Sequence, residues 1–218
     1  MNQNLTEMIF ILDMSGSMDN LRSDTIGGYN TLINQQKNET GDANVTTVLF
    51  DDRYIVLHDN VNIHDVPEMT TKEYSPLGMT AMLDAIGRTI NSVGQRLAST
   101  PEEKRPAKIV VTIVTDGYEN ASKEFTYSKI KEMIKHQREK YSWIFTFIGA
   151  NIDTAEVGDN LGIDAKLSKC YTASADGTAS VYAAASKAIS YTRGISDVAT
   201  MNCCATVDAI EKILDEVE

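Results

Sequence analysis

Three short apolar runs stand out along the chain. They cover residues 7–13, 107–115 and 143–150 and are rich in isoleucine and valine. Runs that are apolar on both faces are typical of central strands in a parallel sheet that helices cover on each side. The first run ends at Asp13, and Asp116 follows the second. We therefore expect both carboxylates to leave the sheet at the ends of buried strands.

The segments between these runs carry apolar residues at helical spacing. In residues 81–97 and around 130–141, the apolar positions recur every three or four residues. Residues 18–37 show a weaker stripe, which Gly27 and Gly28 interrupt. Two glycines inside a helix cost roughly 1 kcal/mol each relative to alanine, so we expect this helix to pack closely against a neighbour there.

Residues 45–50 and 53–58 are two further apolar runs, and only Asp51 and Asp52 separate them. This spacing is typical of a hairpin, so the second strand should run antiparallel to the first and lie at the edge of the sheet. We interpret both aspartates as turn residues of the hairpin and leave them outside the candidate site.

Shorter elements follow residue 150. We expect a strand near 167–171 and helices near 154–161, 178–193 and 206–217. The last helix has an apolar docking face, formed by Val207, Ile210, Leu214 and Val217.

This alternation of strands and helices is the signature of a doubly wound α/β fold. We predict a mostly parallel, six-stranded sheet with one antiparallel edge strand and helices on both faces. Residues 1–194 would form the domain, and residues 195–218 would supply a linker and a C-terminal helix packed on it.

Charge narrows the classes of partner. The 218 residues include 31 acidic and 20 basic side chains, a net charge of -11. Nucleic acid and anionic membrane surfaces would repel such a chain, so we expect neither as a partner. No apolar run approaches the roughly 20 residues needed to span a bilayer, and residues 1–7 lack the features of a secretory signal. We therefore expect a cytoplasmic protein whose three cysteines are reduced and buried or half-buried.

Polar residues gather where the first strand gives way to a helix. Asp13, Ser15 and Ser17 stand in a DxSxS pattern at this junction, Thr80 precedes the helix of residues 81–97, and Asp116 follows a second strand. In open α/β sheets, ligands bind at the carboxyl ends of the strands, near the point where the strand order reverses. We expect these five side chains to meet at that edge.

Two carboxylates and three hydroxyls form an all-oxygen ligand set. Such a set suits a hard octahedral cation such as Mg²⁺ or Mn²⁺ and is a poor one for zinc or copper. The two aspartates would balance the charge of the ion, so a further carboxylate could approach it without being repelled.

The DxSxS of Asp13, Ser15 and Ser17, followed by Thr80 and Asp116, resembles the metal-ion-dependent adhesion site (MIDAS) of von Willebrand factor type A (vWA) domains. The resemblance extends over residues 5–194. It is strongest to small single-domain bacterial and phage members, which share stretches like residues 28–30, 50–52 and 80–86.

This resemblance implies a Rossmann-like vWA fold and an ion anchored by Asp13, Ser15 and Ser17. Thr80 and Asp116 would bind the ion directly or through water. The last coordination position would be filled by a Glu or Asp of a protein partner.

The same residues also have purely structural interpretations. Ser15, Ser17 and Thr80 could cap helices through their hydroxyls, and Asp116 before Gly117 could be a turn former. All five residues in one chain and in family order favour the metal site.

The leading hypothesis is a non-enzymatic, metal-dependent module that captures an acidic side chain of a protein partner. One alternative is a metal-dependent phosphohydrolase, although a phosphoaspartyl enzyme usually has a second carboxylate where this chain has Ser15. Another is a metal-independent scaffold. A further possibility is a scaffold that signals through its C-terminal helix, which the resemblance implies could shift when the metal site binds its ligand.

Overall fold

A computed structural model describes residues 1–216. Within them, six strands form one sheet in the order β3-β2-β1-β4-β5-β6. The strands are β1 (Asn2–Asp13), β2 (Asp42–Phe50), β3 (Tyr54–Asn62), β4 (Pro106–Thr115), β5 (Ile144–Ala150) and β6 (Ser168–Tyr171). The α-helices are α1 (Arg22–Lys37), α2 (Met82–Ser99), α3 (Tyr127–Tyr141), α4 (Thr154–Leu161), α5 (Ala175–Gly194) and α6 (Cys204–Leu214).

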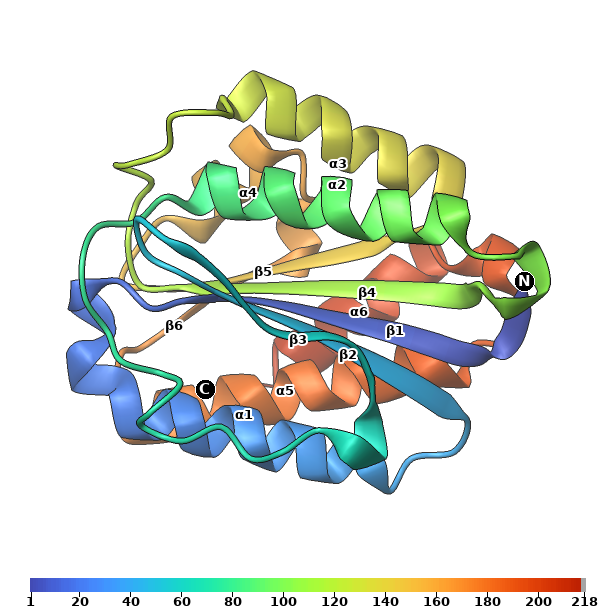
Figure 1. The fold of residues 1–218 in the computed structure, drawn as a ribbon, viewed down its shortest axis with the longest axis horizontal. Coiled ribbons are helices and arrows are strands. Elements are labelled where there is room, and N and C mark those ends of the chain that lie inside the picture. Colours follow the sequence, from blue (N-terminus) through green and yellow to red (C-terminus); the bar gives the residue numbers. More distant parts are fainter. Residues whose placement is uncertain (217–218) are drawn as a thin grey trace.

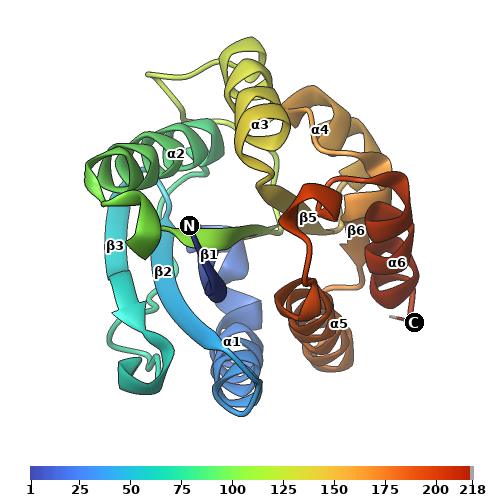
Figure 2. The same ribbon diagram turned by 90° about the vertical axis from the view of Figure 1, so that its right-hand side faces the viewer.

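The helices lie in two layers around the sheet. Helices α1 and α5 cover one face, and α2, α3 and α4 cover the other (Figure 1). The end-on view in Figure 2 places α6 beside the β6 end of the sheet. This is the predicted doubly wound α/β architecture with helices on both faces. In the described part of the chain, none of the helices has the length and apolar character needed to cross a bilayer.

Strand order reverses at β1, which lies between β2 and β4 and pairs in parallel with both. Leu12 is opposite Leu49 on one side and opposite Val114 on the other. Because β1 and β4 are parallel neighbours, Asp13 and Asp116 leave the sheet at the same edge, as predicted.

The hairpin prediction is also confirmed, since β3 pairs antiparallel with β2 and lies at the edge of the sheet. Its pairing is irregular, with register shifts between Val45 and Val48. Asn60 on β3 has a left-handed backbone conformation, with φ of 54°.

Apolar stripes of the helices account for the core. Met82, Ile86, Ile90 and Val93 of α2 are all buried, as the spacing of residues 81–97 predicts. They belong to a cluster on the α2 face of the sheet, and a second cluster fills the space between the sheet, α1 and α5.

One long segment was not predicted as a structural element. Residues 63–80, here called the strap, run from the end of β3 along α1 to the start of α2 (Figure 1). The side chains of Arg22, Asn30 and Lys37 on α1 donate hydrogen bonds to backbone carbonyls of residues 66–74. Polar side chains of α1 therefore fix the path by which the chain reaches Thr80.

The C-terminal helix packs through three of the four predicted docking residues. Val207, Ile210 and Leu214 are buried in the cluster on the α2 face of the sheet. Val217 lies outside the described residues, and the domain boundary at residue 194 stays a prediction.

The cysteines are free thiols, as expected, but their predicted burial is wrong at two positions. Cys170 and Cys204 are exposed, and Cys203 is partly buried. Cys170 lies on β6, an edge strand of the sheet, and Cys204 lies at the start of α6 outside its buried face.

The two glycines of α1 differ in their surroundings. A Cβ on Gly28 would lie 2.5 Å from Cδ2 of Tyr182 on α5, far inside van der Waals contact, whereas a Cβ on Gly27 would meet nothing within 4 Å. The close packing expected from the glycine pair is confirmed at Gly28, where α1 and α5 approach each other.

We predict opposite effects for alanine at these two positions. Gly28→Ala should lower the free energy of unfolding by about 1–3 kcal/mol, because the new methyl overlaps the buried Tyr182 ring. Gly27→Ala is the matched control and should raise it by up to about 1 kcal/mol, because alanine is the better helix former. Urea unfolding of both variants measures the difference, and effects of the same sign would contradict the contact.

Candidate metal centre

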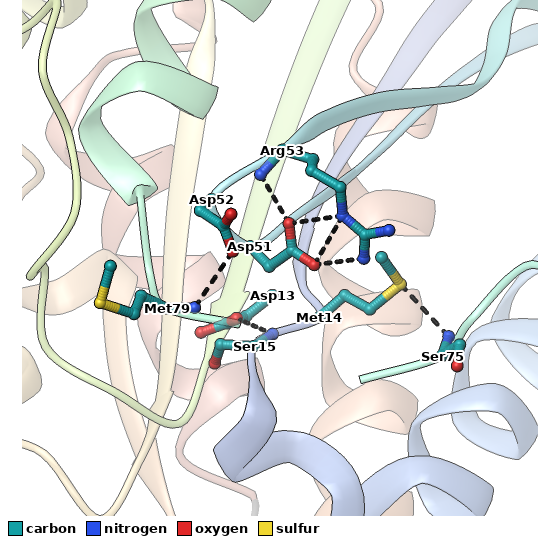
Figure 3. A network of polar contacts seen from close by, with 8 residues as sticks. All are labelled: Asp13, Met14, Ser15, Asp51, Asp52, Arg53, Ser75 and Met79. Carbon is teal, nitrogen blue, oxygen red and sulfur yellow. Dashed lines mark hydrogen bonds and ion pairs between the residues drawn. The ribbon is translucent and has the colours of Figure 1, made fainter. Parts of the chain in front are cut away.

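Asp13 is the last residue of β1, and its carboxylate is fully buried. Oδ1 accepts a hydrogen bond from the backbone N–H of Ser15 at 2.7 Å, and Oδ2 accepts one from Oγ1 of Thr115 at 2.5 Å. Thr115 ends the neighbouring strand β4. The carboxylate is thus fixed between the two strands at the predicted edge, next to Ser15 (Figure 3).

Hydroxyl groups connect this turn to Asp116. Oγ of Ser15 lies 3.1 Å from Oγ of Ser17, and Ser17 Oγ donates to Oδ1 of Asp116 at 2.5 Å. Ser15 is buried, Asp116 is partly buried and Ser17 is exposed. The group therefore reaches from the interior at Asp13 to the surface at Ser17.

Thr80 joins this group from the end of the strap. A Cβ built on Gly117 would lie 3.4 Å from Oγ1 of Thr80 and 3.8 Å from Oγ of Ser17, so Gly117 lies against both hydroxyls. Asn120 fixes the backbone of Thr80 through two hydrogen bonds. Thr80 N donates to Oδ1 of Asn120, and Asn120 N donates to the backbone oxygen of Thr80. The structure thus brings all five predicted site residues to one edge of the sheet.

Helix capping does not account for the hydroxyls. Ser15 precedes the 3-10 turn Gly16–Leu21, but its side chain makes no capping hydrogen bond, and the residue in the capping position of α2 is Ala81. The first N–H groups of α2 are bound by Glu119 and Ser122 instead. The capping alternative is therefore wrong for Ser15 and Thr80.

Asp51 does more than form the hairpin turn that the sequence predicts. Its buried carboxylate binds the guanidinium of Arg53 (Figure 3). Its backbone carbonyl oxygen accepts a hydrogen bond from Ala81 N at 3.0 Å. Gly78 O accepts from Gly16 N at 3.1 Å. The hairpin turn and the DxSxS turn therefore hold the loop that carries Thr80 between them.

Asp84 and Glu119 hold the loop after Asp116 in a similar way. The Asp84 carboxylate accepts hydrogen bonds from three consecutive backbone N–H groups, those of residues 123–125. Glu119 accepts from two N–H groups of its own loop and from Leu83 N on α2. Sequence reasoning missed these supports, along with Asn120 and Thr115. Asp84, Glu119 and Asn120 act on the backbone of a distant segment, and Thr115 acts on the distant side chain of Asp13.

Burial makes ionisation of the two aspartates costly. It raises the pKa of Asp13 from 3.8 to about 6, although the hydrogen bonds from Thr115 and Ser15 act in the opposite direction. Burial also raises the pKa of Asp116, and the bond from Ser17 partly offsets this. Both carboxylates therefore lie where a neighbouring positive charge would stabilise them.

The described residues supply no such charge. Among residues 1–216, no ion pair involves Asp13 or Asp116. By contrast, buried Glu7 pairs with Arg96 and buried Asp51 pairs with Arg53. Because buried charges in proteins are paired or bound to metal, the donor set fits a cation.

The chemistry of the donors indicates which cation. Within the described residues, no three His, Cys, Asp or Glu side chains lie together as a metal-binding group. The cluster consists of two carboxylates and three hydroxyls, which is an oxygen set suited to Mg²⁺ or Mn²⁺.

Comparison with solved structures identifies the fold. Two solved structures of proximal thread matrix protein 1 from the mussel byssus align with TM-scores of 0.62 and 0.60, each at 19% identity over 85% of this chain and 46% of theirs. The second is described as having a zinc-occupied MIDAS motif. A von Willebrand factor type A structure from Catenulispora acidiphila aligns with a TM-score of 0.52, at 14% identity over 96% of this chain and 42% of that one.

The chain spans less than half the length of these solved structures. No protein-family model and no curated protein matches its sequence. At these levels of identity, the likeness concerns the backbone, and the strand order and helical layers agree with it. The chain has the von Willebrand factor type A fold.

Proposed function

We propose that this chain is a divalent-metal-dependent protein-binding module. Mg²⁺ or Mn²⁺ binds at the edge formed by β1 and β4, and a Glu or Asp side chain of a protein partner binds to the ion. The ligands are Asp13, Ser15, Ser17, Thr80 and Asp116. The observation that carries the proposal is the buried Asp13 carboxylate, which has hydroxyls but no basic side chain around it in the described residues.

Charge balance explains why such a site would bind a carboxylate. The two aspartates neutralise a divalent ion, and the three hydroxyls add no charge. When bound, the ion supplies a Lewis-acidic position for an anionic oxygen. Ser17 is exposed and Asp116 is partly exposed, so a partner side chain can reach this end of the cluster.

The same residues favour binding over phosphoryl transfer. A phosphoaspartyl enzyme needs an acid or base close to its nucleophilic aspartate and a cation to hold the phosphate. Here Ser15 occupies the position two residues after Asp13, and its hydroxyl is bonded to Ser17. Within residues 1–216, no lysine, arginine or histidine side chain forms a hydrogen bond to any of the five cluster side chains.

The central prediction concerns metal binding. Mg²⁺ at about 100 times its Kd should raise the melting temperature of EDTA-stripped protein by about 5 °C or more, and Asp13→Ala should abolish this shift. Ser17→Ala should weaken Mg²⁺ binding by roughly tenfold, because one ligand is lost. Calorimetric titration with Mg²⁺, Mn²⁺ and Zn²⁺ measures the affinities directly.

Ser23→Ala is the matched control, because Ser23 is an exposed serine on α1 outside the cluster. It should leave every metal affinity unchanged. If the wild-type chain binds none of the three ions, even with added acetate to complete the coordination, the five residues are structural and the proposal is wrong.

The raised pKa of Asp13 predicts an unusual pH dependence in the absence of metal. Between pH 3.8 and about pH 6, Asp13 is ionised in the unfolded chain but keeps its proton in the folded chain. The free energy of unfolding therefore falls as the pH rises through this range, and the loss persists above pH 6. A shift of this size corresponds to about 3 kcal/mol.

Asp13→Asn removes this contribution with little change of shape. In EDTA, the free energy of unfolding of the variant relative to that of wild type should therefore increase by roughly 2.5 kcal/mol from about pH 4 to about pH 7.5. Urea unfolding at the two pH values tests this, and saturating Mg²⁺ should reverse the order at the higher pH. A difference in stability that does not change with pH would mean that burial does not raise the pKa of Asp13.

A further inference from the structure

Large apolar side chains are exposed next to the candidate metal centre. Among the described residues, those most exposed near the site are Leu77, Met79 and Tyr118, at 66%, 56% and 52%. All three lie within three residues of Thr80 or Asp116, on the two loops that bring these residues to the cluster. Single exposed apolar side chains are ordinary, but a group that surrounds a polar site marks an interaction surface.

Leu77 and Met79 form one side of this group. Leu77 N donates to Met14 O at 2.9 Å, so the loop lies directly against the DxSxS turn. Met79 N lies 3.4 Å from Oδ1 of Asp52, and the Met79 side chain points away from Asp51 and Asp52 (Figure 3). Backbone contacts thus hold the loop while its apolar side chains face solvent.

Tyr118 forms the other side. It follows Asp116 by two residues, and its hydroxyl accepts a hydrogen bond from the backbone N–H of Asp153 at 3.1 Å, at the start of α4. Asp153 follows β5, whereas Leu77 and Met79 adjoin the β2–β3 hairpin. The edge of β1 and β4 that carries the cluster therefore has exposed apolar side chains on both flanks, of which Tyr118 is held by its hydroxyl.

The buried apolar core does not include these side chains. None of the three belongs to either buried apolar cluster, and their loops are held by backbone and carboxylate hydrogen bonds. The surroundings are acidic, with Asp52 and Glu119 on the adjacent turns and a net charge of -11 overall. A partner with several acidic residues would be repelled beyond the ion, whereas apolar residues on either side of one acid would gain contact area.

We infer that Leu77, Met79 and Tyr118, here called the apolar rim, select a partner segment in which a single Glu or Asp is flanked on both sides by apolar side chains. The inference rests on the proposed function, because the ion must hold the carboxylate. The rim then provides specificity, and the ion provides the anchoring contact.

Two synthetic peptides test the inference on the full chain loaded with Mg²⁺. One has aspartate between two leucines, and the other has aspartate between two serines, in the same glycine-capped frame. We expect the leucine peptide to bind at least about tenfold more tightly in fluorescence polarisation, because the rim buries its side chains. EDTA should abolish the binding of both.

Variants assign the preference to the rim. Leu77→Ser combined with Met79→Ser, and Tyr118→Ser separately, should each reduce the preference for the leucine peptide by threefold or more, with Mg²⁺ affinity unchanged. Val56→Ser and Tyr191→Ser are matched controls, because both residues are exposed and apolar but lie on β3 and α5. They should leave the preference intact.

The possible failures are distinguishable. If calorimetry shows Mg²⁺ binding but the peptides bind equally, or neither binds, the rim has no selective role and only this inference falls. If none of Mg²⁺, Mn²⁺ and Zn²⁺ binds, even with added acetate, the proposed function falls and the inference with it. A preference that survives the rim substitutions would place the specificity elsewhere and overturn the inference.

Discussion

The parallel pairing of β1 with β4 underlies both the fold and the site. Leu12 lies opposite Val114, so the turn after each strand begins at the same height of the sheet. Thr115 then bonds directly to Asp13, a contact between residues 102 positions apart in sequence. The strand pairing is stabilised by apolar burial on both faces, and this burial also removes Asp13 from water. The site is thus built at the cost of desolvating a carboxylate.

The surrounding loops are arranged so that the hydroxyls of Ser15 and Thr80 do not cap the helices that follow them. The start of helix α2 could bind the hydroxyl of Thr80, but the carboxylate of Glu119 and the hydroxyl of Ser122 accept from the N–H groups of Leu83 and Asp84 instead. Asp51 and Arg53 satisfy each other and support the loop from the hairpin side. The charged side chains around Thr80 are therefore already bound to backbone groups or to each other. The two aspartates of the cluster are left without a basic partner in the described residues, a condition that a divalent ion would relieve.

Sequence patterns predicted the features that depend on burial. The strands that end at Asp13 and Thr115, the hairpin and the α2 stripe follow from the spacing of apolar residues, and the meeting of the site residues follows from parallel topology. The strap could not be predicted in this way, because polar side chains of α1 hold it through backbone carbonyls and leave no periodic signal. The role of Asn120 could not be predicted either, because it depends on where the fold places Thr80.

The irregular pairing of β2 and β3 bears on how the protein behaves when concentrated. A straight, exposed edge strand offers its free N–H and C=O groups to the edge of another molecule and so promotes aggregation. Here the register shifts near Thr47 and the left-handed Asn60 distort that edge. At the opposite edge β6 is only four residues long. Both ends of the sheet are thus poor templates for strand addition, which disfavours open-ended assembly by edge-to-edge pairing.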